Sequence, residues 1–170
     1  MTYRKAKACS RQDIRKVANF IRRIDGSENV LFFDIVRFLE IVFPSIVDGF
    51  SLEIGTKDEM GDAQGLTYPD KLVIKIREDV YDRAVKGVGR DRLTLAHELY
   101  HLLNHDESNI TFARTDNEIS LKTYEDPEWQ ADAFGGELLI PKHLIANMTA
   151  EEIADKCQVS LAAAKFCKRH

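Results

Sequence analysis

His97-Glu98-Leu99-Tyr100-His101 is the stretch that decides how this 170-residue chain is interpreted. It has the pattern H-E-x-x-H, in which two histidines four positions apart share one face of an α-helix. Imidazoles at that spacing can converge on one metal ion, each about 2.0–2.1 Å from it. The glutamate between them can reach a metal-bound water without binding the metal, which is the position of a general base. The motif therefore predicts a zinc site with His97 and His101 as ligands and Glu98 as base.

The residues around the motif predict that its helix packs on a core. Leu95, Leu99 and Leu102 recur at helical spacing, which is the pattern of an amphipathic helix. Asp91 is the expected N-cap, because an aspartate side chain accepts hydrogen bonds from the free N–H groups of a first turn. A packed helix that directs polar groups inward needs a partner for them, and a metal ion is such a partner.

Two histidines leave the site one ligand short, because catalytic zinc usually takes three protein ligands and a water. His105 continues the series, but in a straight helix its Cα lies about 12 Å along the axis from that of His97, too far for all three histidines to meet one ion. The glycine and the more distant histidine of the metzincin pattern are absent. We therefore expect His105 to be structural or to lie near the rim of the site.

A second helix is predicted downstream of the motif. Asp126 and Pro127 have the character of an N-cap and a first helical residue. The helix is expected to run from Pro127 towards Leu139 and to stop near Pro141, because proline cannot continue a helix.

This second helix offers a third ligand. Glu128 and Asp132 are four positions apart and share a face. The pattern resembles the second helix of gluzincin peptidases, in which the glutamate is the third ligand and the aspartate orients a histidine. A solvated acidic helix face is the alternative interpretation, and Glu125 and Glu137 are rival ligands.

Two longer segments resemble the ImmA/IrrE family of metallopeptidases. Arg92-Leu-Thr-Leu-Ala-His-Glu-Leu-Tyr-His-Leu-Leu-Asn-His105 is similar to that family's R-x-T-L-A-H-E-L-G-H-x-x-x-H. Glu128-Trp-Gln-Ala-Asp-Ala-Phe-Gly-Gly-Glu-Leu-Leu-Ile-Pro141 is similar to its E-x-x-A-(D/N)-x-F-A-x-x-L-L-M-P. The stretch 65–83 fits the family's lead-in, so the resemblance covers about residues 50–145 in the right order.

The sequence departs from the family pattern at two places. Tyr100 stands where the family usually has glycine, which leaves the ligands intact and is expected to narrow the space beside the helix. Gly135 and Gly136 replace small alanines and are expected to weaken the second helix near its end.

The resemblance implies an α+β fold of the zincin type. A small mixed or antiparallel sheet would pack against the H-E-x-x-H helix, with helices before it and a helical hairpin after it. By position, Zn²⁺ would be held by His97, His101 and Glu128, while Glu98 activates water and Asp132 supports a ligand. Tyr124, Tyr68 and His105 are candidate transition-state stabilisers, with surface or core packing as the alternative for each.

The resemblance also implies a function. The best-known family members cleave helix-turn-helix repressors, in the regulation of mobile elements and stress responses. The chain is therefore expected to be a zinc-dependent endopeptidase whose substrate or partner is a helix-turn-helix transcriptional repressor or an antitoxin. A net charge of −4 argues against a nucleic-acid protein and would not repel a basic repressor.

Composition predicts a cytoplasmic globular protein. The chain is 44% hydrophobic and 31% charged, and no run approaches the ~18 apolar residues of a membrane span. The first thirty residues are charged and show no signal peptide. Cys9, Cys157 and Cys167 are odd in number and lack zinc-site spacing, which fits free thiols in a reducing compartment. We expect residues 1–145 to form the peptidase domain and 146–170 a hairpin packed on it.

Periodicity predicts the elements around the two metal-bearing helices. Apolar stripes indicate helices over 11–24 and 33–43, the second ending before a proline. Residues 50–54 and 72–76 are expected to be strands, as are 63–68. Residues 106–124 are polar and irregular, and are expected to be either a mobile lid or a solvated loop.

The C-terminal segment resembles a helix-turn-helix core. Thr149 and Glu152 form a capping-box pattern, helices are expected over 150–157 and 161–168, and Gln158 stands where the turn glycine would be. The charge balance of residues 149–170 is only +1, which is poor for neutralising phosphates. Packing on the peptidase core or on a repressor is therefore favoured over DNA binding.

Three functional hypotheses follow from the sequence. The first is a zinc endopeptidase that acts on a regulatory protein. The second is a protein of the same fold with an occupied or degenerate site that works by binding, for example in a toxin–antitoxin pair. The third is a DNA-binding module. A Glu98→Gln variant separates the first two, because it should retain zinc and lose cleavage only in an enzyme.

Overall fold

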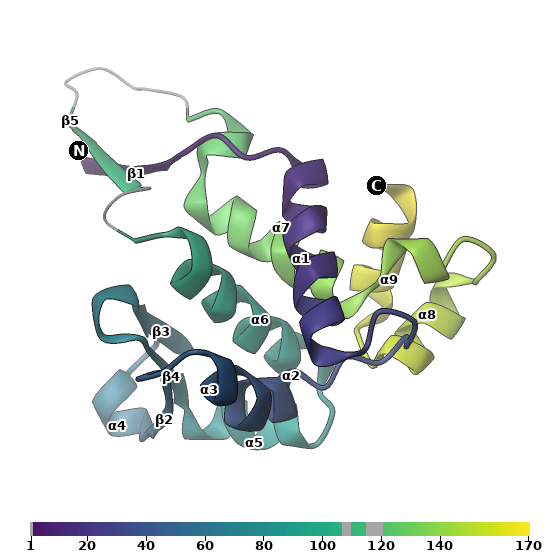
Figure 1. Cartoon of the computed structure of the whole chain (residues 1–170), viewed down its shortest axis with the longest axis horizontal. Helices are drawn as coiled ribbons and strands as arrows, with labels where there is room; N and C mark the ends of the chain where they lie inside the picture. Colours follow the sequence, from purple (N-terminus) through teal and green to yellow (C-terminus); the bar gives the residue numbers. More distant parts are fainter. Residues whose placement is uncertain (1, 107–109, 115–120) are drawn as a thin grey trace.

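The fold is built around two helices that carry the sequence motifs. A computed structural model describes residues 2–106, 110–114 and 121–170, with the backbone alone for 2–3 and 110–114. Helices α6 (Gly89–Asn104) and α7 (Pro127–Leu139) pack against each other at the centre (Figure 1). A small sheet lies beside α6, and the hairpin of α8 (Ala150–Cys157) and α9 (Leu161–Arg169) lies at the other end of the molecule. The α+β fold class expected from the sequence is confirmed.

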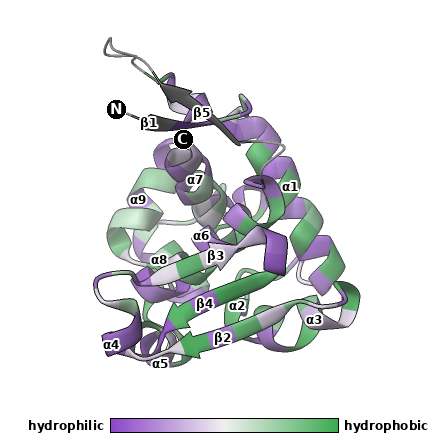
Figure 2. Cartoon of the chain, turned by 90° about the vertical axis from the view of Figure 1, so that its left-hand side faces the viewer, coloured by the Kyte–Doolittle hydropathy of each residue, from purple (hydrophilic) through white to green (hydrophobic). Residues whose placement is uncertain are grey.

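The sheet has three strands in the order β2 (Ser51–Gly55), β4 (Val73–Arg77), β3 (Gly65–Tyr68). β2 is parallel to β4, and β3 is antiparallel to it. Ile74 and Ile76 of the central strand are fully buried, and Figure 2 shows the three strands across the face of the molecule. β3 is the edge strand nearest α6, so the mixed sheet expected beside the motif helix is confirmed.

Helix α1 (Arg11–Asp25) covers the opposite side of α7. Ser10 caps its first turn by accepting a hydrogen bond from the Asp13 amide. The helix ends at Gly26, whose φ of 77° is a left-handed conformation that glycine adopts without steric cost. The predicted helix over 11–24 is therefore confirmed to within one residue.

The second predicted helix, over 33–43, begins later and ends later than expected. It consists of α2 (Ile35–Arg37), a π-helical turn (Phe38–Val42) and α3 (Phe43–Ile46), and so continues past Pro44. Proline has no N–H, and its ring clashes with the carbonyl four residues back in a regular α-helix. The wider π turn immediately before Pro44 relieves that clash, which is how the helix passes a residue expected to stop it.

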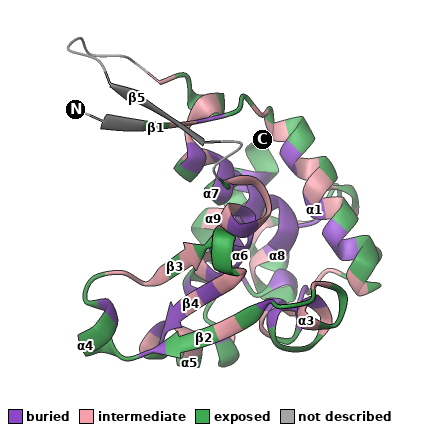
Figure 3. Cartoon of the chain, turned by 60° about the vertical axis from the view of Figure 1, so that its left-hand side comes forward, coloured by how far each residue is buried: buried purple, intermediate pink, exposed green. Residues whose placement is uncertain are grey.

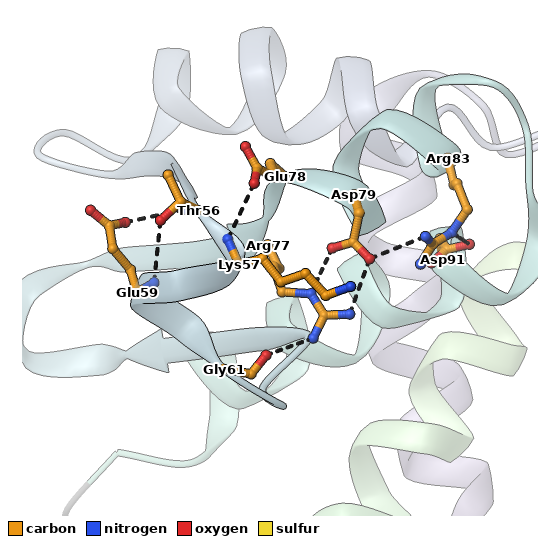
Figure 4. Close-up of polar contacts among 9 residues, drawn as sticks. All are labelled: Thr56, Lys57, Glu59, Gly61, Arg77, Glu78, Asp79, Arg83 and Asp91. Carbon is orange, nitrogen blue, oxygen red and sulfur yellow. Dashed lines mark hydrogen bonds and ion pairs between the residues drawn. The ribbon is translucent and has the colours of Figure 1, made fainter.

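The prediction that Asp91 caps the motif helix is wrong. α6 begins at Gly89, and Asp91 lies inside its first turn, where its carboxylate accepts two hydrogen bonds from Arg83 of α5 (Glu78–Val85). Arg83 also contacts Asp79, which pairs in turn with Arg77 at the end of β4 (Figure 4). This chain of ion pairs fixes the start of α6 to the sheet and to α5.

Helix α4 (Lys57–Met60) joins the same polar network. Thr56 and Glu59 form a capping box at its start, and the Lys57 amide donates to Glu78 of α5 (Figure 4). Arg77 donates to the Gly61 carbonyl just after the helix. The loop between β2 and β3 is therefore held at both ends by side chains of neighbouring elements.

The hairpin of α8 and α9 meets the first turn of α6. Arg92 donates hydrogen bonds to the carbonyls of Cys157, Gln158 and Phe33. Burial lowers the pKa of Arg92 to about 10. Gln158 has a φ of 51°, the left-handed conformation expected at the turn. Both predicted hairpin helices are confirmed.

A two-stranded ribbon was not expected from the sequence. β1 (Thr2–Ala6) pairs antiparallel with β5 (Ile110–Arg114). β5 falls within 106–124, so the expectation of an irregular segment is wrong over 110–114. The stretches 107–109 and 115–120, to which the lid hypothesis also applied, lie outside the described residues. Short 3₁₀ turns complete the fold at Pro69–Lys71, Thr123–Glu125 and Lys142–Leu144.

The core lies between the sheet, α1, α6 and α7. Figure 3 shows buried residues concentrated on β4 and on the facing surfaces of these helices. Leu95 and Leu99 of α6 and Phe134 and Leu138 of α7 are fully buried. Within the described ranges, no helix has both the length and the apolar composition that crossing a bilayer would require.

Candidate metal centre

The close approach of α6 and α7 brings the two sequence motifs together. Gly135 lies at this contact, where a Cβ would be 3.3 Å from Leu93 Cδ2 and 3.7 Å from the Ala96 side chain. Gly136 lies close to Cys167 of α9, where a Cβ on the glycine would be 3.3 Å from Sγ. The two glycines that were expected to weaken α7 therefore stand where it packs against its neighbours.

Three side chains direct donor atoms at the junction of the two helices. His97 Nε2 and His101 Nε2 are 2.9 Å apart on α6. Glu128 at the start of α7 places Oε2 3.1 Å from His97 Nε2 and Oε1 3.4 Å from His101 Nε2. Two ligands about 2.05 Å from a tetrahedral ion would be about 3.3 Å apart. The donor set and its spacing therefore fit a zinc ion bound by three protein groups.

Asp132 fixes the orientation of one histidine. Its Oδ1 lies 2.7 Å from His97 Nδ1, and a carboxylate can only accept, so Nδ1 carries the proton. The lone pair of Nε2 is then directed at the junction, as metal ligation requires. Burial lowers the pKa of His97, but the hydrogen bonds to Asp132 and Glu128 outweigh it and raise this pKa to about 10. A cation, either a proton or a metal ion, is therefore strongly favoured at this point.

The rival ligands from the sequence lie elsewhere. Glu137 is buried on the side of α7 that faces α1, where Arg11 and Arg15 contact both of its carboxylate oxygens. Glu125 pairs with Lys5. Within the described residues, the group that could hold a metal is His97, His101 and Glu128.

A cleft of about 1050 Å³ opens over this junction. Its walls are β3 on one side and the three candidate ligands on the other, and Glu98 lies between them. The side chains of Glu128 and Asp132 are largely exposed at the rim, whereas only 8% of Glu98 is exposed. A carboxylate beside the junction and shielded from bulk water is suited to act as a base.

Two residues of β3 that the sequence did not single out position Glu98. Thr67 Oγ1 donates to Glu98 Oε2 at 2.6 Å. Gly65 leaves room for the same side chain, because a Cβ there would lie 2.6 Å from Glu98 Cγ. No motif spacing links β3 to α6, so these roles become visible only when the strand and helix are placed together.

If the cleft binds zinc and cleaves peptides, Thr67→Val is expected to reduce cleavage about tenfold without reducing zinc content, because the base loses a hydrogen bond of about 1–3 kcal/mol that holds it in place. Thr67→Ser should retain most of the activity. Thr94→Val is the matched control, since the Thr94 hydroxyl bonds to the Arg90 carbonyl of its own helix. The measurements are the rate on a protein substrate and the zinc content. Equal cleavage rates for Thr67→Val and wild type would show that Thr67 does not support Glu98.

The three candidate transition-state stabilisers lie in two different places. Tyr68 and His105 line the cleft. Tyr124 lines a different hollow of about 490 Å³ together with Cys9 and Trp129. Burial lowers the pKa of His105 to about 4, so this ring is neutral.

Tyr100 occupies space beside the motif helix but is not among the residues that line the cleft. It is 1% exposed, stacks on Phe134 of α7 and points its hydroxyl at Cys9 Sγ, 3.6 Å away. Tyr100 lies one position before His101 and therefore points away from the histidine face of the helix. It fills space between α6 and α7 behind the metal site.

The family follows from sequence comparison. The model of the IrrE N-terminal-like domain, a family of M78 peptidases, matches residues 57–166. The chain belongs to the ImmA/IrrE family. The match contains every residue of the junction and the cleft residues Gly65 and Thr67. The resemblance of the two motif segments to ImmA/IrrE metallopeptidases is thereby confirmed.

Other comparisons show the fold alone. A comparison with curated protein sequences found no match. A solved structure of a Mycobacterium tuberculosis transcriptional regulator is similar, with a TM-score of 0.57 and 13% sequence identity. The alignment covers 90% of this chain and 45% of that one, so this ImmA/IrrE family member spans less than half the length of its structural neighbour.

Proposed function

We propose that this protein is a zinc-dependent endopeptidase that cleaves a helix-turn-helix transcriptional repressor. The observation that carries the proposal is the junction of α6 and α7, where lone-pair donors of His97, His101 and Glu128 meet beside Glu98. Three acceptors directed at one point repel one another unless a cation lies between them. Three protein ligands with an open side are the arrangement of catalytic rather than structural zinc.

The residues of the cleft then have distinct roles. A bound zinc ion would supply Lewis acidity, which polarises a peptide carbonyl and lowers the pKa of water. Glu98 accepts a proton from the attacking water on its carboxylate and later delivers it to the leaving amine. Thr67 and Gly65 hold this carboxylate in place, and Asp132 keeps the proton of His97 on Nδ1.

The shape of the cleft suits an extended peptide. β3 pairs with β4 along one edge, and its other edge borders the cleft. Backbone groups on such an edge can pair with a substrate strand. Leu66, Thr67 and Tyr68 of β3 line the same cleft, so an extended segment of a substrate can lie along this strand. The choice of a helix-turn-helix repressor, or of an antitoxin of that type, rests on the family resemblance.

The first experiment is the zinc content of wild type, Glu128→Ala and Glu125→Ala, measured by elemental mass spectrometry. We expect about one zinc per wild-type chain, loss of most of it in Glu128→Ala and retention in Glu125→Ala. Glu125→Ala is the matched control, because Glu125 lies one turn earlier and pairs with Lys5 outside the junction.

Two outcomes would contradict the proposal. If wild-type protein takes up no zinc after metal addition, a zinc-peptidase function is excluded and the binding-module hypothesis is favoured. Zinc retained by Glu128→Ala would show that the third ligand is a different residue.

A further inference from the structure

We propose that His105 and Gln130 are positioning residues that direct the lone pair of His101 at the metal. This inference rests on the proposed zinc site and extends it to two residues beyond the three metal ligands. His101 Nδ1 lies 2.7 Å from His105 Nδ1, and His105 Nε2 lies 2.8 Å from Gln130 Oε1. The three side chains form one continuous chain of hydrogen bonds.

The direction of every bond in this chain is fixed at its far end. The amide nitrogen of Gln130 lies 2.9 Å from the Lys7 carbonyl and 2.8 Å from the Tyr124 carbonyl. Carbonyl oxygens only accept, so both bonds require the amide NH₂ group at this position. The Gln130 oxygen must then face His105. Gln130 is 2% exposed, so water does not offer it other partners.

The remaining protons follow by exclusion. Because Gln130 Oε1 can only accept, His105 Nε2 donates to it and carries a proton. An imidazole with its one proton on Nε2 accepts at Nδ1, so the proton between the two rings is assigned to His101 Nδ1. With Nδ1 protonated, His101 Nε2 has a free lone pair, and it is this nitrogen that lies near His97 and Glu128.

The two histidine ligands are thus held by different groups. A carboxylate, Asp132, accepts from His97, whereas a neutral ring accepts from His101. His105 is itself held by packing, with its ring edge-on to Tyr100 at a centroid distance of 5.2 Å. The histidine support orients its ligand without placing another carboxylate beside the metal ligands.

The first test compares two substitutions of His105. His105→Asn places a carboxamide oxygen near the position of Nδ1 and retains an acceptor, whereas His105→Leu has similar bulk and no acceptor. Both remove the ring that packs on Tyr100, so a purely structural role would be affected equally. We expect zinc affinity, measured by competition with a chromophoric chelator, to fall about 10–100-fold in His105→Leu and to stay close to wild type in His105→Asn. His143→Leu is the control, since His143 contacts the Glu28 carbonyl away from the junction.

The second test determines which ring nitrogens of His101 and His105 carry protons. Long-range ¹H–¹⁵N NMR of zinc-loaded, histidine-labelled protein should show His105 protonated on Nε2 alone and His101 protonated on Nδ1. A proton on His105 Nδ1, or equal zinc affinities of His105→Asn and His105→Leu, would overturn the positioning role of His105. Either result would leave the zinc site itself intact. If wild-type protein binds no zinc, the zinc site and the positioning role of His105 and Gln130 are both overturned.

Discussion

Glu98→Gln is expected to lower the rate of substrate cleavage about 10²–10⁴-fold, the usual contribution of a general base. The amide is the same size but cannot accept a proton from water at neutral pH. Zinc content should remain at the wild-type level, because Glu98 contacts Thr67 rather than the junction. Substrates can be found without prior assumption by labelling new N-termini in cell extract incubated with wild type or with the variant.

Glu125→Gln provides the control for this result, because it makes the same change at an ion pair outside the junction. Undiminished cleavage by Glu98→Gln would exclude Glu98 as the base. Loss of zinc from the variant would instead make Glu98 part of the metal site. If wild type and variant are equally inactive on every substrate but retain the biological effect, the protein works by binding, as the toxin–antitoxin hypothesis holds.

Gly89→Ala is expected to destabilise the protein by about 3 kcal/mol, a large effect for one methyl group. A Cβ at this position would lie 2.7 Å from Val159 Cα and 2.9 Å from Ser160 N. Both are backbone atoms, which cannot move away by a change of rotamer as a side-chain atom can. The loss corresponds to a decrease of about 6–12 °C in the melting temperature of a chain of this size, which calorimetry can measure.

Gly136→Ala is the matched control for this prediction. Its Cβ would meet the Cys167 Sγ at 3.3 Å, which is a side-chain contact that can adjust. Alanine also favours the interior of a helix over glycine by about 1 kcal/mol, so the net change should be small. Equal stability of Gly89→Ala and wild type would show that the hairpin of α8 and α9 can move away from α6 at little cost.

The sequence predicted the parts of the fold that local patterns encode. The limits of α7 follow from Asp126 and Pro127 at its start and Pro141 after its end, and the structure has them there. Asp91 shows where local reasoning fails. Its type suits an N-cap, but Arg83 from another helix competes for the same carboxylate. An ion pair between distant segments leaves no trace in the residues next to Asp91.

The same difference between local patterns and contacts of distant segments applies to the candidate metal centre. Helical spacing alone brought His97 and His101 together, and a motif on a second helix supplied Glu128 as a candidate. Thr67 and Gly65 were missed because their contact with Glu98 depends on how β3 lies against α6. His105 lines the cleft, and its contact with Gln130 could not be predicted without knowing the packing of α7.

The metal ligands and the support of the base belong to different elements. His97, His101 and Glu128 come from two helices packed tightly through Gly135, whereas Thr67 lies on a separate sheet. In the proposed enzyme, a mutation in β3 can therefore weaken cleavage without emptying the metal site. If the proposed function holds, cleavage and metal binding can be lost separately, so a protein of this fold could keep the cleft for capturing a target after its cutting activity has weakened.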